Sequence, residues 1–254
     1  MEIRFDDKVV LITGASTGIG ATLARAFAEA GADIVVHYNS SKEAAEAVAR
    51  DVEAAGRKAL LVQADVTRSE ERKKLAEAAL KEFGRVDVLI NNAGGLVRRS
   101  PVADLPEELY NEVMDLNFAS TVMMCKEIIP TMQKQGGGAI INVTSVAARH
   151  GGGSGALIYA ASKGAISTFT HGLAKELAPH NIRVNALSPG VILTPFHEKV
   201  TSQAQMDAMV ATIPMGRAGT TEECVGAAFF LASDTMAGYV TGQILEVNGG
   251  QYMP

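Results

Sequence analysis

Short hydrophobic runs alternate with helix-like segments along the whole chain. Six runs predict strands, at 8–12, 32–38, 58–64, 86–92, 138–144 and 182–188, and a seventh candidate covers 244–249. Most are continuously apolar rather than alternating, which is typical of parallel strands buried on both faces. Between the first four, residues 21–31, 41–56 and 69–84 have apolar positions three and four apart and end in a glycine. These segments predict helices with left-handed glycine caps.

This alternation predicts an α/β fold, a doubly wound parallel sheet of about seven strands with helices on both faces. No linker, repeat or low-complexity tract divides the chain, so residues 1–254 are predicted to form one domain. The alternation is weakest at about 190–220, directly after a strand. We interpret this segment as a flap that closes over a substrate, with Phe196 as a candidate wall of the pocket.

Composition narrows the classes of partner. Apolar residues make up 47% of the 254 residues, enough for the core of one large domain. The net charge of −5 and the lack of a basic block argue against nucleic acid as a partner. No leader-like segment or membrane-length apolar run is present, so we expect a cytoplasmic protein with no membrane partner.

Two cysteines and one histidine are the candidate metal ligands or nucleophiles. Cys125 and Cys224 lie in apolar, helix-like runs and are predicted to be buried structural thiols. His197, in HEKV, has no second ligand at helical spacing, so no metal site is predicted.

The loop TGASTGIG, residues 13–20, joins the first predicted strand to the first helix. A helix N-terminus offers unpaired N–H groups and partial positive charge, and glycines let the backbone approach a phosphate closely. The spacing G-x-x-x-G-x-G departs from the G-x-G-x-x-G dinucleotide fingerprint, so an ordinary tight turn remains the alternative. The predicted phosphate-site residues are Gly14, Ser16, Thr17, Gly18, Ile19 and Gly20.

The end of the second predicted strand bears on the choice of cofactor. Sites for NAD(H) usually carry Asp or Glu here, to bind the ribose 2′-hydroxyl, but this chain has Tyr38 and Asn39. No carboxylate would repel a 2′-phosphate, and Asn39, Ser40, Ser41 and Lys42 can donate hydrogen bonds to one. This pattern favours NADP(H), and NAD(H) stays open because no arginine is present at this position.

The sequence YAASK places Tyr159 and Lys163 four residues apart in a predicted helix, on one face. The ammonium is expected to lower the pKa of Tyr159 from about 10 towards the working pH. Such a tyrosine can give a proton to a carbonyl oxygen as hydride arrives, or accept one from an alcohol in reverse. Ser145, which closes the strand at 138–144, can hydrogen-bond the same oxygen.

These motifs occur together with Asp65-Val66, NNAG at 91–94, Asn117 in DLNFAS and Pro189-Gly190. In this order they resemble the short-chain dehydrogenase/reductase family over essentially the whole chain. The resemblance implies a single-domain Rossmann-like fold that moves hydride between a nicotinamide and a carbonyl or alcohol. It also implies a homotetramer acting on a small-molecule substrate.

The resemblance also implies roles for individual residues. Asn117, Ser145, Tyr159 and Lys163 form the catalytic tetrad, in which Asn117 fixes a water in a proton relay to Lys163. Further cofactor contacts fall to Asp65, Val66, Asn91, Ala93, Gly94, Tyr159, Lys163, Pro189, Gly190, Ile192 and Thr194. A non-catalytic scaffold on the same fold would lack Tyr159 or Lys163, and both are present.

Two departures from the usual family pattern concern the substrate. Fourteen positions, one more than usual, separate Ser145 from Tyr159, and the extra residue falls in a glycine-rich loop. The segment NAGGLVRRSP places two arginines near the cofactor, where one can bind a carboxylate or both can be solvated loop charges. The chain resembles a subgroup that reduces keto-sugar acids such as 4-deoxy-5-hexoseulose uronate. The candidate substrate contacts are Gly95, Arg98, Arg99, Ser145, Arg149, His150 and Phe196.

A second subgroup, the 3-oxoacyl-acyl-carrier-protein reductases, is the alternative. These enzymes need a basic docking patch for an acidic carrier protein. In KELAPHN, residues 175–181, His180 stands where a basic docking residue is expected, and the chain is negatively charged overall. Both features weaken the alternative without removing it.

Overall fold

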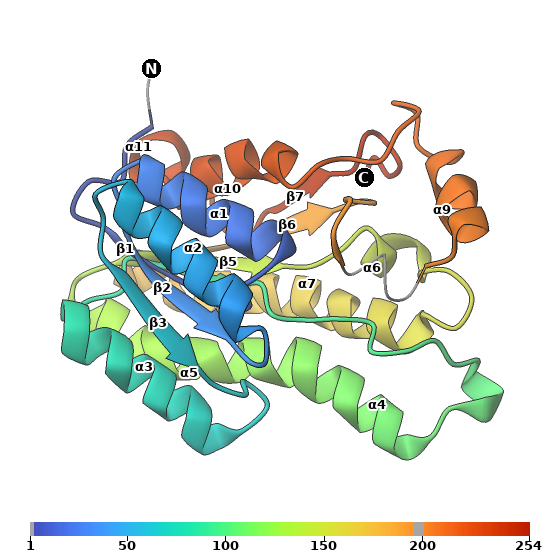
Figure 1. Ribbon diagram of the computed structural model, residues 1–254, viewed down its shortest axis with the longest axis horizontal. Helices are drawn as coiled ribbons and strands as arrows, with labels where there is room; N and C mark the ends of the chain where they lie inside the picture. The colour runs from blue at the N-terminus through green and yellow to red at the C-terminus, as the bar shows by residue number, and fades with distance from the viewer. Residues whose placement is uncertain (1–2, 196–200) are drawn as a thin grey trace.

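A parallel sheet of seven strands runs through the centre of the molecule, in the order β3-β2-β1-β4-β5-β6-β7 (Figure 1). The structure is a computed structural model that describes residues 3–195 and 201–254. The strands are β1 Val9–Ile12, β2 Asp33–Tyr38, β3 Ala59–Gln63, β4 Val88–Asn91, β5 Gly138–Val143, β6 Ile182–Pro189 and β7 Ile244–Val247. Every neighbouring pair is parallel; Leu11 of β1 pairs with Val35 of β2 and with Leu89 of β4. The predicted fold class is confirmed.

Helices cover both faces of the sheet. The main helices are α1 Gly18–Glu29, α2 Lys42–Ala54, α3 Ser69–Phe83, α4 Glu107–Met114, α5 Ser120–Lys134, α7 Leu157–Leu177 and α10 Val225–Ala232. Shorter ones are α6 Ala147–His150, α9 Gln203–Val210 and α11 Asp234–Ala237. Single turns lie at Val102–Asp104, Asp115–Ala119, Ala178–His180 and Glu222–Cys224. The expected left-handed caps are present, since Gly31, Gly56 and Gly84 have φ angles of 104°, 76° and 72°.

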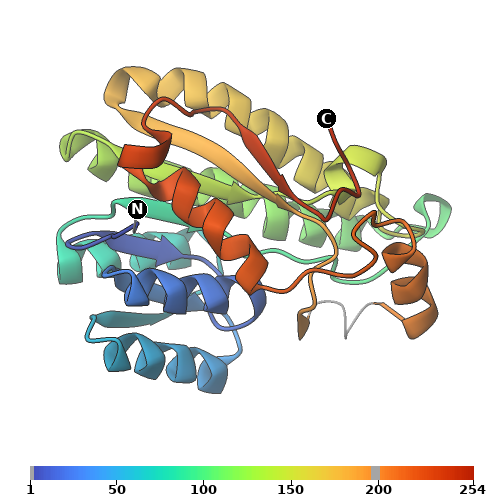
Figure 2. The ribbon, with the colours of Figure 1, turned by 90° about the horizontal axis from the view of Figure 1, so that it is seen from above.

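The alternation of side chains along each strand divides the core into two clusters. Val10 and Ile12 of β1 face α1, α2 and α10, and Figure 2 shows α10 (red) beside α1 (blue) on that side of the sheet. Val9 and Leu11 face α3, α5 and α7. Such fully apolar strands form only where helices cover both faces, as the continuous hydrophobic runs predicted.

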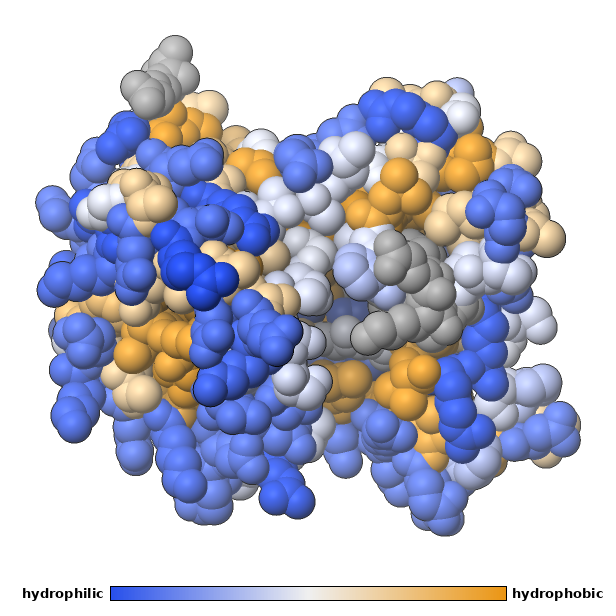
Figure 3. Space-filling model, in the orientation of Figure 1, coloured by the Kyte–Doolittle hydropathy of each residue, from blue (hydrophilic) through white to orange (hydrophobic). Residues whose placement is uncertain are grey.

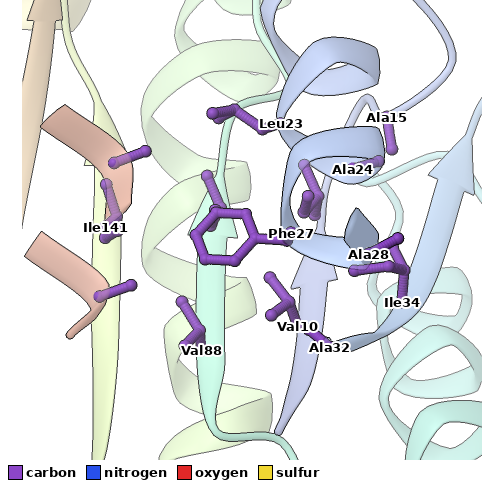
Figure 4. Packing of buried hydrophobic residues seen from close by; sticks show 14 of the residues in the cluster. Val10, Ala15, Leu23, Ala24, Phe27, Ala28, Ala32, Ile34, Val88 and Ile141 are labelled. Atoms are coloured by element: carbon purple, nitrogen blue, oxygen red, sulfur yellow. The ribbon is translucent and has the colours of Figure 1, made fainter. Parts of the chain in front are cut away.

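Phe27 is the central residue of the first cluster. It projects from α1 towards the sheet between Val10 and Val88 (Figure 4) and is fully buried. Its ring also packs against Phe5 and Phe229, with centroids 4.7 and 4.8 Å away. Truncation of such a side chain to alanine typically costs about 3–5 kcal/mol. This packing fixes α1, and with it the glycine loop, on the sheet.

The two cysteines are buried, as predicted, one against each face of the sheet. Burial raises the pKa of the Cys125 and Cys224 thiols to about 12, so neither is a ready thiolate. In residues 3–195 and 201–254, no helix is both long and apolar enough to cross a membrane.

The order of the strands reverses between β1 and β4, because the chain winds from β1 outwards to β3 and then returns. Ligands of open α/β sheets bind at this switch point, beyond the carboxyl ends of the strands. In Figure 3 the surface is hollowed near its centre, between the side that carries α1 to α3 and the side that carries α9.

Candidate active site

A cavity of about 760 Å³ runs along the carboxyl ends of the strands. It brings together most of the residues that the sequence assigned to the cofactor. Those that line it are Gly14, Ser16, Thr17, Gly18, Ile19, Asn39, Ser40, Ser41, Asp65, Val66, Ala93, Gly94, Tyr159, Lys163, Pro189, Gly190, Ile192 and Thr194. Six segments far apart in the sequence therefore form one binding surface.

The glycine loop is shaped as a cradle for an anion. Gly14 and Gly18 have φ angles of 65° and 55°, in the left-handed region that favours glycine. A Cβ on Gly20 would lie 2.3 Å from the carbonyl oxygen of Gly14, so no side chain fits there. The N-cap, Thr17, makes no side-chain capping bond, which leaves the first N–H groups of α1 available. Glycine packing and a helix N-terminus together fit the diphosphate of a dinucleotide.

Three predicted cofactor residues do not line the cavity. Gly20 acts through packing, as its close approach to the Gly14 carbonyl requires. Tyr38 is buried in the cluster under α1 and α2. Asn91 is buried in the sheet, where its Nδ2 donates to Asn142 Oδ1 (3.0 Å) and to Cys125 Sγ (3.2 Å).

The buried position of the Asn91 side chain follows from strand geometry, because successive residues point to opposite sides. Asn92, which the sequence analysis left unassigned, lines the cavity instead. Its Nδ2 donates to the carbonyl oxygens of Thr13 (2.9 Å) and Gly14 (3.0 Å). Thr13 Oγ1 in turn accepts the N–H groups of Asn92 and Ala93, both at 3.0 Å. The NNAG segment therefore anchors the glycine loop.

Tyr159 and Lys163 face the cavity one turn apart on α7, with Ser145 beyond the end of β5. Lys163 is only 3% exposed, and its Nζ donates to the carbonyl oxygen of Val143 at 2.8 Å. Burial lowers the pKa of this ammonium to about 8.

The pKa of Tyr159 differs from the sequence expectation. Burial raises it, and a hydrogen bond with Ser145 lowers it in part. The Lys163 ammonium is held at Val143, 5.8 Å from the centroid of the tyrosine ring, and the expected lowering of the Tyr159 pKa by Lys163 is not found. The tyrosine of this structure is therefore a protonated phenol, ready to donate.

Asn117 lies behind this group rather than in the cavity wall. It is fully buried in a π-helical turn, Asp115–Ala119, between α4 and α5. Its Nδ2 donates to the carbonyl oxygens of Val113 (2.8 Å) and Gly95 (2.9 Å), and its Oδ1 accepts from Gly95 N (3.0 Å). A Cβ on Gly94 would lie 2.6 Å from Asn117 Oδ1 and 3.1 Å from Lys163 Nζ. The missing side chain of Gly94 lets these two polar groups approach each other.

On the substrate side, Arg99 and His150 line the cavity along with Ser145. Arg99 Nη1 donates to the carbonyl oxygen of Ser154 at 2.8 Å, and Ser100 N donates to the carbonyl oxygen of Gly155 at 3.0 Å. The glycine-rich loop is therefore docked on the arginine segment.

The remaining candidate substrate residues lie elsewhere. Arg98 is exposed and does not line the cavity, and the backbone of Gly95 is bound by Asn117. Arg149 instead pairs with Glu246, with Nε 2.9 Å from Oε1, and stacks on the ring of Tyr252. The contact with Tyr252 holds the segment after β7, and the Glu246 carboxylate neutralises the charge of Arg149. Phe196 lies outside the described residues.

Several cavity residues were given no individual role from the sequence. His37 and Asn92 belong to the cofactor side, and Leu96, Leu116, Ala208, Met209, Thr212 and Gln251 to the other end. Gln251 Nε2 donates to Thr212 Oγ1 at 2.9 Å, which joins the segment after β7 to the predicted flap. In the described ranges, no three His, Cys, Asp or Glu side chains cluster as a metal site would require. His197 lies outside those ranges.

Comparisons with known proteins identify the family of the chain. A family model described as enoyl-(acyl carrier protein) reductase matches residues 14–251. The 3-oxoacyl-(acyl-carrier-protein) reductase of Synechocystis is 40% identical over 246 residues, covering 97% of this chain and 97% of that protein.

Two solved structures are similar over 98% of the chain. An NADH-dependent reductase, A1-R′, responsible for alginate metabolism, has a TM-score of 0.89 at 37% identity, and 98% of that chain is covered. A 7α-hydroxysteroid dehydrogenase in complex with NADH and 7-oxo glycochenodeoxycholic acid has a TM-score of 0.92 at 36% identity, with 96% covered.

The chain belongs to the short-chain dehydrogenase/reductase family. It is an oxidoreductase that acts on a carbonyl or alcohol group with a nicotinamide dinucleotide, NAD(H) or NADP(H).

Proposed function

We propose that this protein reduces the carbonyl group of a small keto-sugar acid or related α-keto acid. One observation carries the proposal: Arg99 lines the same cavity as Tyr159 and Ser145. A guanidinium in this position can bind a substrate carboxylate through two parallel hydrogen bonds while the carbonyl lies at the tyrosine. The similarity to a reductase responsible for alginate metabolism supports the same substrate class.

The chemistry divides between cofactor and protein. When bound, the reduced nicotinamide supplies the hydride that the carbonyl carbon receives. The Ser145 hydroxyl orients the carbonyl oxygen, and the Tyr159 hydroxyl gives that oxygen its proton. The raised pKa of Tyr159 suits this direction, because the phenol keeps its proton until negative charge develops on the substrate oxygen. Lys163 and the neighbouring Asn117 are the proposed route by which the phenolate regains a proton.

We infer a preference for NADPH over NADH. Asn39, Ser40 and Ser41 line the cavity after β2, and each offers a donor to a 2′-phosphate. No Asp or Glu stands at the end of β2, where a carboxylate would repel the phosphate. The two similar structures are described with NADH, so a direct comparison of the two cofactors decides the point.

A 3-oxoacyl-(acyl-carrier-protein) reductase is the second candidate, favoured by the 40% identity with the Synechocystis enzyme. His180 is exposed on the turn after α7, where the sequence analysis expects a basic docking residue. An imidazole is a weaker partner for an acidic carrier than arginine or lysine at neutral pH.

We also propose that residues 1–254 act as one dinucleotide-binding domain in a cytoplasmic homotetramer, with 190–220 as a closing flap. Tyr110 on α4, Met123 on α5 and Leu157 on α7 are apolar side chains with substantial exposure, which contacts between subunits would bury. Sedimentation at micromolar concentration should give a tetramer, and a monomer would contradict this assembly.

A reduction assay tests the substrate proposal. NADPH and NADH are each paired with a keto-uronate, a neutral ketosugar and an acetoacetyl thioester. Arg99→Met is expected to raise the KM for the keto-uronate by about 10- to 100-fold, through loss of a charge-assisted contact. The KM for the neutral ketosugar should change little. Arg98→Met is the matched control, because Arg98 does not line the cavity. Activity confined to the thioester would overturn the substrate class.

A further inference from the structure

His37, in β2, is buried beneath the cofactor end of the cavity, and both of its ring nitrogens are bonded. It is 1% exposed. Its Nδ1 accepts the backbone N–H of Gly14 at 2.9 Å. Its Nε2 lies 2.9 Å from the carbonyl oxygen of Ala64, directly before Asp65 and Val66. One imidazole therefore spans the gap between the glycine loop and the end of β3.

These contacts assign the protonation state of the ring. A backbone N–H can only donate, so Nδ1 must present a lone pair to Gly14. The proton of the neutral ring is therefore on Nε2, where it is donated to Ala64. Burial lowers the pKa of His37, which favours this neutral form.

The charged groups around the ring are few. Asp65 follows Ala64, and Arg68 and Glu71 at the start of α3 contact Asp65 rather than the ring. Residues 13–20 of the glycine loop contain no ionisable side chain.

Side chains on both sides of the glycine loop bind the two polar backbone groups of Gly14. Asn92, directly after β4, binds its carbonyl oxygen, and His37 in β2 binds its N–H. At a φ of 65°, the residue stands in a conformation that a free glycine leaves easily. Two side chains, one in β2 and one directly after β4, thus hold both polar groups of one loop residue.

We propose that His37 is a positioning residue for the cofactor: its Nδ1 holds the glycine loop in the shape of a preformed dinucleotide site, and its bond to Ala64 keeps the ring in the tautomer that does so. The proposal rests on the dinucleotide-binding role of this cavity. No sequence motif assigns the position, because histidine at the end of an apolar strand looks like an ordinary core residue. Its expected effect is on cofactor affinity rather than on the chemical step.

Two substitutions separate this role from a packing role. His37→Asn places an amide oxygen where Nδ1 stands, so it keeps an acceptor for the Gly14 N–H and gives up the reach to Ala64. His37→Gln places its amide nearer the Nε2 position, so it keeps a partner for Ala64 and leaves the Gly14 N–H unpaired. The backbone bond from Ala15 N to the His37 carbonyl oxygen, 2.8 Å, does not involve the side chain at position 37 and is expected in both variants.

The test is a fluorescence titration of the substrate-free enzyme with NADPH and with NADH. We expect His37→Gln to weaken Kd about tenfold or more, since a buried unpaired N–H is costly, and His37→Asn to stay within about threefold of the wild type. In turnover, the KM for the cofactor should rise in His37→Gln much more than kcat falls. Equal affinities in His37→Gln and the wild type, or equal losses in both variants, would overturn the proposal.

Hydrogen exchange provides a measurement that does not depend on the variants folding. The Gly14 amide of the wild type should exchange slowly, and rapid exchange in the folded protein would contradict the contact with His37. A wild type that binds neither dinucleotide would overturn the proposed function and this inference together. Binding by the wild type with no change in His37→Gln would overturn this inference alone.

Discussion

Burial of the charged Lys163 side chain should lower the free energy of unfolding by a measurable amount. The pKa of Lys163 falls from its ordinary 10.5 to about 8 because the ammonium is taken out of water. At roughly 1.4 kcal/mol for each tenfold change in proton affinity, this corresponds to about 3 kcal/mol. Below about pH 8 the folded and the unfolded chain both carry the charge, so the full cost is present. Between about pH 8 and 10.5 the unfolded chain binds more protons, and stability rises with pH.

The perturbation that exposes this cost is Lys163→Met. It removes the charge but leaves the Val143 carbonyl oxygen without its 2.8 Å partner, a loss of about 1–3 kcal/mol that does not depend on pH. The informative quantity is therefore the difference in unfolding free energy between wild type and variant, followed from about pH 7 to about pH 10. We expect that difference to move by about 2–3 kcal/mol in favour of the wild type.

Urea unfolding of the cofactor-free proteins, followed by far-UV circular dichroism, measures this difference. Groups that titrate equally in both proteins make equal contributions, which cancel in this difference. Lys175→Met, an exposed lysine of the same helix, is the matched control and should leave the pH dependence unchanged. Parallel stability curves for the wild type and Lys163→Met would refute the argument that burial destabilises the charged lysine.

Two further substitutions test the site directly. Tyr159→Phe should abolish turnover and leave cofactor affinity largely intact in a binding titration, because it removes the proton donor alone; retained turnover would refute the role as acid. Gly20→Ala should abolish dinucleotide binding, since its Cβ would lie 2.3 Å from the Gly14 carbonyl oxygen. Gly172→Ala in α7 is its control: nothing lies within 4 Å of the added carbon, so binding should be unchanged.

The fold could be predicted from the sequence because the hydrophobic pattern of a doubly wound sheet is repeated and local. Each strand predicted at 8–12, 86–92 or 182–188 lies within two residues of its observed bounds. Motif residues in loops after strands were placed in the cavity for the same reason, because parallel strands bring those loops to one edge.

The sequence did not predict the direction in which a side chain points within its element. The NNAG motif predicts Asn91 as a cofactor contact, whereas strand alternation turns the Asn91 side chain into the core and leaves Asn92 at the cavity. Arg149 is predicted as a substrate contact beside His150, but it forms an ion pair with Glu246, a residue distant along the chain. The expected lowering of the Tyr159 pKa failed because spacing on a helix cannot report how deeply a phenol is buried. These properties are set by tertiary contacts.

The absence of a side chain at Gly94 couples two polar residues, Asn117 and Lys163. A side chain there would reach Asn117 Oδ1 and Lys163 Nζ at once, so all three positions share a single small volume. Substitutions within such a volume do not act additively. Asn117, Lys163 and Gly94 should therefore vary in evolution, and in any redesign of this enzyme, as one unit: a change tolerated at one of them depends on what the other two have become.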